Sequence, residues 1–135
     1  MAVADTGFAV ALNNKKDQYH ADVKRVYVEQ EQILLPQTVL AEVAYLIHRD
    51  AGTDQLVRFL NALPVSRFCT VCLTDLDFAR SAAILEQYSD SRIDFVDASV
   101  MAVAERYNSD TILTLDRRDF SLYRPLHCST FVLLP

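Results

Sequence analysis

The sequence from Asp94 to Asp116 reads DFVDASVMAVAERYNSDTILTLD, and it holds a helix pattern followed by a strand pattern. Apolar side chains recur at helical spacing at positions 96, 100, 103, 104 and 107. Residues 111–115 then form a short apolar run that ends at Asp116. A helix that leads into a buried strand is the unit from which parallel α/β sheets are built, so this stretch predicts such a sheet.

The same alternation continues through the rest of the chain. Short apolar runs predict strands at residues 3–5, 33–36, 68–73 and 130–134, and helical patterns cover residues 6–12, 18–30, 38–49, 54–63 and 74–88. Thr74 with Asp77 forms a capping signature at the start of the last of these helices. We therefore predict an α/β domain with a mostly parallel sheet, spanning residues 1–135 as a single domain.

Composition excludes several function classes. A chain of 135 residues is long enough to bury a core without disulfides. It has only two glycines, Gly7 and Gly52, and these lie too far apart for a Walker A loop or a dinucleotide-binding turn. The formal net charge of −5 argues against a protein that coats nucleic acid through a broad basic surface. An enzyme that contacts a few phosphates remains compatible with that charge.

Membrane, secretory and thiol functions also have little support. The longest apolar stretch, residues 38–47, is interrupted by Glu42 and is too short to span a bilayer. The N-terminus lacks the basic start of a signal peptide, so we expect a cytoplasmic protein. Cys69 and Cys72 have C-x-x-C spacing, but residues three apart on a strand point to opposite faces. A redox or zinc site at this pair is therefore not expected.

Four carboxylates occupy positions where a parallel sheet builds its sites. Asp5 and Asp116 follow predicted strands, Asp97 begins a helix at the same edge, and Glu42 stands inside an apolar helix stripe. An unpaired buried carboxylate is costly, so four acids that converge at one edge have a divalent cation as their natural partner. Oxygen ligands alone suit Mg²⁺ or Mn²⁺ and the hydrolysis of phosphodiesters.

Each acid also has a simpler interpretation. An aspartate at a helix start is commonly an N-cap, which covers Asp5, Asp94 and Asp97 taken singly. Glu42 could be a surface residue, and residues 116–119 could form a solvated turn with local ion pairs. The joint pattern, and no single residue, favours the metal site.

Four segments together resemble the PIN-domain family, close to its VapC-type toxins. They are VADTGF at 3–8, LP with VLAEV at 35–43, DFVDAS with AVAER at 94–106, and ILTLDRRDF at 112–120. The resemblance implies a three-layer α/β/α sandwich and a Mg²⁺- or Mn²⁺-dependent endoribonuclease of a type II toxin–antitoxin pair. It assigns catalysis to Asp5, Glu42, Asp97 and Asp116, with Asp5 and Asp97 as the main metal ligands. Supporting roles fall on Thr6, Thr114 and Asp94.

The resemblance also implies partners. These are an RNA substrate, a second copy in a homodimer, and an antitoxin whose C-terminal segment covers the site, often with an arginine. Helices bearing Tyr19, Tyr27 and Tyr45 could bind that segment, although core packing is the expected role for most of these tyrosines. Candidate RNA contacts are Lys15, Lys16, Arg92, Arg117 and Arg118, with Arg49 and Arg124 as further cations.

Two other functions stay open from the residues. One is a non-catalytic PIN-like module that binds RNA or protein. The other, a DNA-directed or flap nuclease, is disfavoured because the chain lacks insertions that would grip a duplex.

Overall fold

The computed structural model describes residues 1–135, with strands and helices alternating along the chain. The strands are β1 Ala2–Ala4, β2 Ile33–Pro36, β3 Phe68–Val71, β4 Thr111–Leu113 and β5 Val132–Leu134. The helices are α1 Thr6–Leu12, α2 His20–Glu29, α3 Gln37–Ala51, α4 Thr53–Ala62, α5 Asp75–Gln87, α6 Phe95–Arg106 and α7 Arg117–Leu122. A single 3₁₀ turn, Leu63–Val65, follows α4.

The five strands form one sheet in the order β3-β2-β1-β4-β5, and every neighbouring pair is parallel. Val3 of the central strand lies opposite Leu34 on one side and Ile112 on the other. All three of these side chains are buried, as expected for a parallel sheet covered on both faces. The predicted parallel α/β sheet is confirmed.

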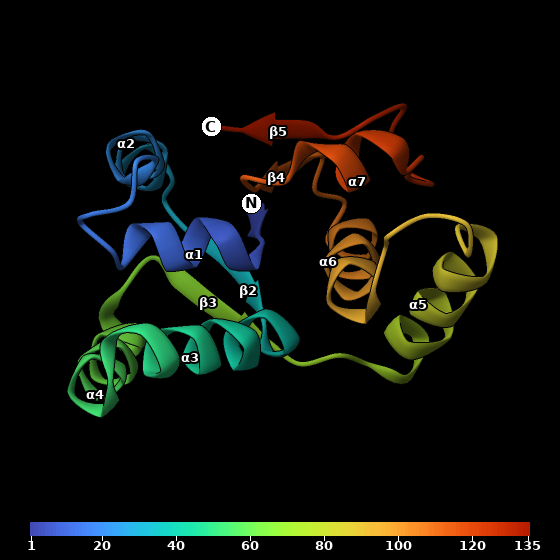
Figure 1. Cartoon of the computed structure of the whole chain (residues 1–135). Helices are drawn as coiled ribbons and strands as arrows, with labels where there is room; N and C mark the ends of the chain where they lie inside the picture. The colour runs from blue at the N-terminus through green and yellow to red at the C-terminus, as the bar shows by residue number, and fades with distance from the viewer.

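Helices cover both faces of this sheet. Helices α1 to α4 lie on one side and α5 to α7 on the other (Figure 1). The chain runs β1 to β2 to β3 in one direction and then returns to β4 and β5, and right-handed crossovers send the two sets of helices to opposite faces. The arrangement is the expected α/β/α sandwich. The order in which the chain adds strands reverses between β1 and β4. Open α/β sheets form their binding crevice at such a point.

One element differs from the sequence expectations. The chain after β4 enters the short helix α7, which the apolar pattern did not predict, so the alternative of a solvated turn at residues 116–119 is wrong. Asp116 caps this helix, because its carboxylate accepts a hydrogen bond from the Arg118 backbone N–H at 3.1 Å. The predicted capping signature of α5 is confirmed as a reciprocal pair between Thr74 and Asp77.

Candidate active site

Asp5 directly follows β1 and is only 7% exposed. It stands at the N-cap position of α1, but its carboxylate makes no capping hydrogen bond, so capping does not account for the side chain. It accepts instead a hydrogen bond of 3.1 Å from the Thr114 hydroxyl, across from β4. Burial raises the pKa of Asp5 to about 6, and the negative charges of Glu42 and Asp116 add to the increase. A buried carboxylate that is held in one orientation is a suitable ligand for a cation.

Thr114 links the acids that follow the two central strands. Its hydroxyl donates to Asp5 and accepts a 2.9 Å hydrogen bond from the Asp116 backbone N–H. The Thr6 hydroxyl, one residue after Asp5, is buried and has no hydrogen-bond partner. Since a buried hydroxyl without a partner is unfavourable, Thr6 has bonding capacity left for a ligand or an ordered water.

Asp97 and Asp94 form a capping box at the start of α6. The Asp94 carboxylate accepts from the Asp97 N–H at 2.9 Å, and one Asp97 oxygen accepts from the Asp94 N–H at 3.2 Å. The capping interpretation is therefore correct for Asp94 and covers one oxygen of Asp97. Desolvation, followed by the charges of Asp94 and Asp5, raises the pKa of Asp97 to about 8. The second Asp97 oxygen has no protein hydrogen bond and can serve as a ligand.

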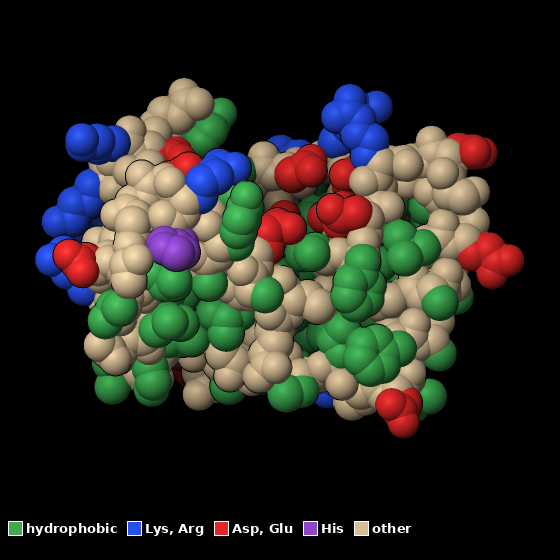
Figure 2. All heavy atoms as spheres, turned by 60° about the horizontal axis from the view of Figure 1, so that its bottom comes forward, with side chains coloured by type: hydrophobic (Ala, Val, Ile, Leu, Met, Phe, Trp, Pro, Cys, Tyr) green, Lys and Arg blue, Asp and Glu red, His purple; other side chains and the backbone are tan.

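The structure brings all four predicted acids to one hollow of about 420 Å³, which we call the acid hollow. Acidic side chains gather in and around a depression on this face of the molecule (Figure 2). Glu42 reaches it from α3 and is half-buried, so it is not simply a surface residue. The lining consists of Asp5, Thr6, Gly7, Glu42, Leu46, Arg92, Asp94, Asp97, Asp116, Arg118 and Asp119.

The predicted RNA contacts divide into two groups. Arg92 and Arg118 line the acid hollow, whereas Lys15 and Lys16 line a neighbouring one. Arg117 donates hydrogen bonds to the carbonyls of Leu133 and Pro135 at the C-terminus. The further cations are also engaged, Arg49 with the Asp50 carboxylate and Arg124 with the Ser121 carbonyl.

One contact near the site had no signal in the sequence. The hydroxyls of Thr38 and Ser99 lie 2.6 Å apart and join the first turn of α3 to α6. These residues are 61 positions apart in the sequence, and no spacing rule links them. The bond ties together the helices that carry Glu42 and Asp97.

The donor set of the acid hollow fits Mg²⁺ or Mn²⁺, because it offers carboxylate and hydroxyl oxygens and no sulfur or imidazole. No group of three or more His, Cys, Asp or Glu side chains already converges tightly enough to hold a metal ion. Mg²⁺ commonly binds through one or two carboxylates and keeps several waters, so it does not require such convergence. The buried Asp5 and the free Thr6 hydroxyl are the observations that support this fit.

The structure also bears on the expectations for the tyrosines, the cysteines and membrane spans. Tyr19 is 45% and Tyr45 63% exposed, so core packing is wrong for both, whereas Tyr27 packs against the core as expected. The three cysteines are unpaired. None of the helices is both long and apolar enough to cross a bilayer.

Comparison with known proteins identifies the family and the fold. The PIN domain family matches residues 2–124. Ribonuclease VapC26 of Mycobacterium tuberculosis is 30% identical over 134 residues, covering 98% of this chain and 99% of its own. Among solved structures, M. tuberculosis VapC20, described as a toxin that cleaves the sarcin-ricin loop, superimposes with a TM-score of 0.83. That match has 24% identity and covers 96% of this chain and 99% of the other.

A toxin–antitoxin complex from Klebsiella pneumoniae has the same fold, with a TM-score of 0.73 at 20% identity, over 90% of this chain and 91% of the other. The fold and the family match define a PIN-domain nuclease. The chain belongs to the VapC-type branch of that family, the ribonuclease toxins of toxin–antitoxin systems.

Proposed function

We propose that this chain is a Mg²⁺- or Mn²⁺-dependent endoribonuclease whose active site is the acid hollow. The observation that carries the proposal is the meeting of Asp5, Glu42, Asp97 and Asp116 in one hollow. They come from four segments far apart in the sequence, at the reversal point of the sheet. A non-catalytic binding module would have no need for four carboxylates at a place where an RNA phosphate must approach.

In this proposal, Asp5 and Asp97 hold the metal, with Glu42 and Asp116 beside them. A metal bound there would activate water and offset the charge that develops on the phosphate. Thr114 keeps the Asp5 carboxylate in one orientation, and Asp94 keeps Asp97 at the start of α6. The Thr6 hydroxyl orients a ligand of the same site.

Adding Mg²⁺ or Mn²⁺ should raise the melting temperature. At a hundred times the dissociation constant, one ion stabilises a fold by about 2.7 kcal/mol, which corresponds to roughly 10 °C for a chain of this size. The measurement is a thermal melt against metal concentration. The exposed Asp54 on α4 provides the control, because Asp54→Asn should keep the shift while Asp97→Asn loses most of it. An equal increase in melting temperature in both variants would show that the metal binds outside the acid hollow.

Asp5→Asn should stabilise the protein in EDTA at pH 8. The folded-state pKa of Asp5 is raised from 3.8 to about 6, so the folded chain binds this proton more tightly than the unfolded chain. The stability that it contributes is complete below about pH 3.8 and is lost as the pH rises through about 6. A shift of this size corresponds to about 3 kcal/mol.

The measurement is urea unfolding of wild type and Asp5→Asn at several pH values. The two should have similar stability at pH 3.5, and the advantage of the variant should grow between about pH 4 and pH 6 and level off above that. A difference that does not change with pH would contradict an ionised, buried Asp5.

We also propose an antitoxin partner, a homodimer and action on RNA in the cytoplasm. An apolar hollow of about 310 Å³, lined by Leu12, Tyr27, Phe59 and Leu63 among others, offers a surface for an antitoxin segment. The exposed Tyr45 is a further apolar contact on α3. An antitoxin arginine would enter the acid hollow favourably, since its positive charge would compensate carboxylates whose pKa values are raised by burial and, to a smaller extent, by neighbouring negative charges.

A further inference from the structure

A second hollow of about 580 Å³ adjoins the acid hollow, and we call it the side groove. It lies between the segment connecting α5 to α6 and helix α7. Its lining consists of Gln87, Tyr88, Asp90, Ser91, Arg92, Arg118, Asp119 and Leu122. Arg92, Arg118 and Asp119 line both hollows, so the two form one continuous depression.

The two arginines at this junction are free to bind an anion. Arg92 and Arg118 are exposed, and neither guanidinium makes an ion pair or hydrogen bond within the protein. This contrasts with Arg80 and Arg106, which are paired with carboxylates. Two unpaired guanidinium groups directly beside the acid hollow suit phosphates, which arginine binds through paired N–H groups.

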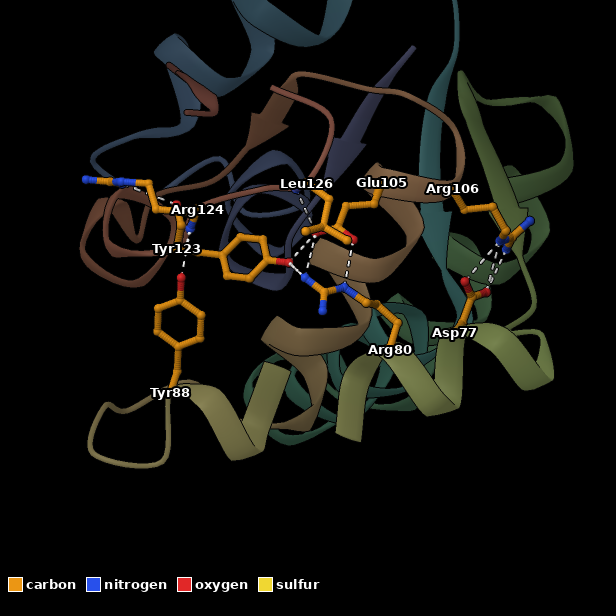
Figure 3. A network of polar contacts seen from close by, with 8 residues as sticks. All are labelled: Asp77, Arg80, Tyr88, Glu105, Arg106, Tyr123, Arg124 and Leu126. Carbon is orange, nitrogen blue, oxygen red and sulfur yellow. Dashed lines mark hydrogen bonds and ion pairs between the residues drawn. The ribbon is translucent and has the colours of Figure 1, made fainter. Parts of the chain in front are cut away.

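The wall of the side groove is held in place before any ligand binds. The Tyr88 ring packs against Tyr123 with 5.4 Å between ring centroids, and its hydroxyl accepts a 3.0 Å hydrogen bond from the Arg124 N–H. Figure 3 shows Tyr88 fixed below these two residues. A volume of about 580 Å³ falls in the range of roughly 300–1,000 Å³ that holds a drug-sized molecule, which is about the size of one nucleotide.

We propose that the side groove binds the RNA strand on one side of the cleaved phosphodiester, with Arg92 and Arg118 holding its phosphates. This rests on the proposed ribonuclease activity of the acid hollow. The strand has to leave the acid hollow, and the side groove continues from it across the two arginines. Asp90 lines only the part of the groove away from the acid hollow, and its negative charge limits how many phosphates can follow. The groove therefore accepts about one nucleotide beyond the cleavage point.

The test uses single-stranded RNA substrates lengthened one nucleotide at a time on either side of one cleavable bond. In the wild type, lengthening on one side should raise kcat/KM by roughly tenfold over the first nucleotide or two, which is the size expected for charge-assisted hydrogen bonds. The double variant R92Q/R118Q should lose this gain. The comparison is the ratio of long to short substrate within each variant, so a general loss of rate does not affect it.

Gln87 provides a pair of variants that changes only the charge of the groove. It is exposed at the end of α5, lines the side groove and lies outside the acid hollow. Gln87→Lys should raise the ratio of kcat/KM for the long substrate to that for the short one, and Gln87→Glu should lower it.

Salt dependence gives a second readout for the arginines. Removing either Arg92 or Arg118 should reduce the slope of log affinity against log salt concentration by about 0.7 for single-stranded RNA.

Arg58→Gln is the control, because Arg58 is exposed on α4 and lines neither hollow. It should leave both the ratio and the salt slope unchanged. If all variants cleave RNA with the same dependence on length as the wild type, the groove proposal is wrong while the ribonuclease proposal stands. If no substrate of any length is cleaved with Mn²⁺ present, the proposed function itself fails.

Discussion

Asp97→Asn should reduce RNA cleavage by about a thousandfold or more and leave the fold intact. The substitution removes one negative charge from the acid hollow, where Asp97 and Asp5 are the expected metal ligands. A loss of this size corresponds to roughly 4 kcal/mol of transition-state stabilisation, within what metal-assisted charge neutralisation contributes. The asparagine side-chain oxygen can still accept the capping hydrogen bond from Asp94 N–H, so helix α6 keeps its start.

The measurement is single-turnover cleavage of RNA by purified protein with Mn²⁺. Asp75→Asn is a matched control, since Asp75 also stands in the first turn of a helix but is exposed and lines no hollow described here. Circular dichroism should show the same helix content for both variants. Undiminished cleavage by Asp97→Asn would refute the site assignment. RNA binding without cleavage by the wild type would favour the non-catalytic module.

Much of the fold and the acid cluster could be predicted because both depend on backbone periodicity. Alternating short apolar runs and helical patterns require a parallel sheet, and the carboxyl ends of parallel strands share an edge. Asp5 and Asp116 follow the adjacent strands β1 and β4, so their proximity depends only on strand order. Asp97 and Glu42 followed only from the joint pattern of four acids, because a helix start or an apolar stripe alone also fits a cap or a surface residue.

The cations and the last helix were harder to predict for a physical reason. Lys15, Lys16, Arg92 and Arg118 have similar charge and exposure, and the path of the loops decides which of them face the site. Helix α7 spans only six residues, RRDFSL, which is too short for an apolar period to show. It forms because Asp116 caps it and because Phe120 is fully buried in the core.

A polar network at the C-terminal end of α6 was also not predictable from the sequence (Figure 3). Glu105 lies on α6, Arg80 on α5, and Tyr123 directly after α7. Arg80 donates to the Glu105 carboxylate at 2.8 and 3.2 Å and to the Tyr123 hydroxyl at 2.8 Å. The Tyr123 hydroxyl and the Leu126 N–H also donate to Glu105. One carboxylate thus joins three segments of the chain.

Glu105→Gln should destabilise the protein by about 3 kcal/mol, a large part of the roughly 5–15 kcal/mol that stabilises a typical domain. The Glu105 side chain is 10% exposed and that of Arg80 24%, so the substitution leaves a largely buried guanidinium without its counter-charge. The new amide N–H₂ also replaces an oxygen that accepts hydrogen bonds. Urea unfolding at pH 7 measures the change.

Two comparisons separate a buried ion pair from simple packing. Replacing both partners, as in Arg80→Met/Glu105→Met, should cost less stability than Glu105→Gln alone, because no unpaired charge remains.

The second comparison is the pH dependence of stability. Burial opposes ionisation of Glu105, but hydrogen bonds from Arg80 and Tyr123, with the charge of Arg80, lower its pKa below 4.5. The stability from this group is complete above about pH 4.5 and lost as the pH falls through the lowered pKa, so Glu105→Gln should flatten the acid limb of the stability curve. A cost below about 1 kcal/mol with an unchanged acid limb would show a solvated pair of little consequence.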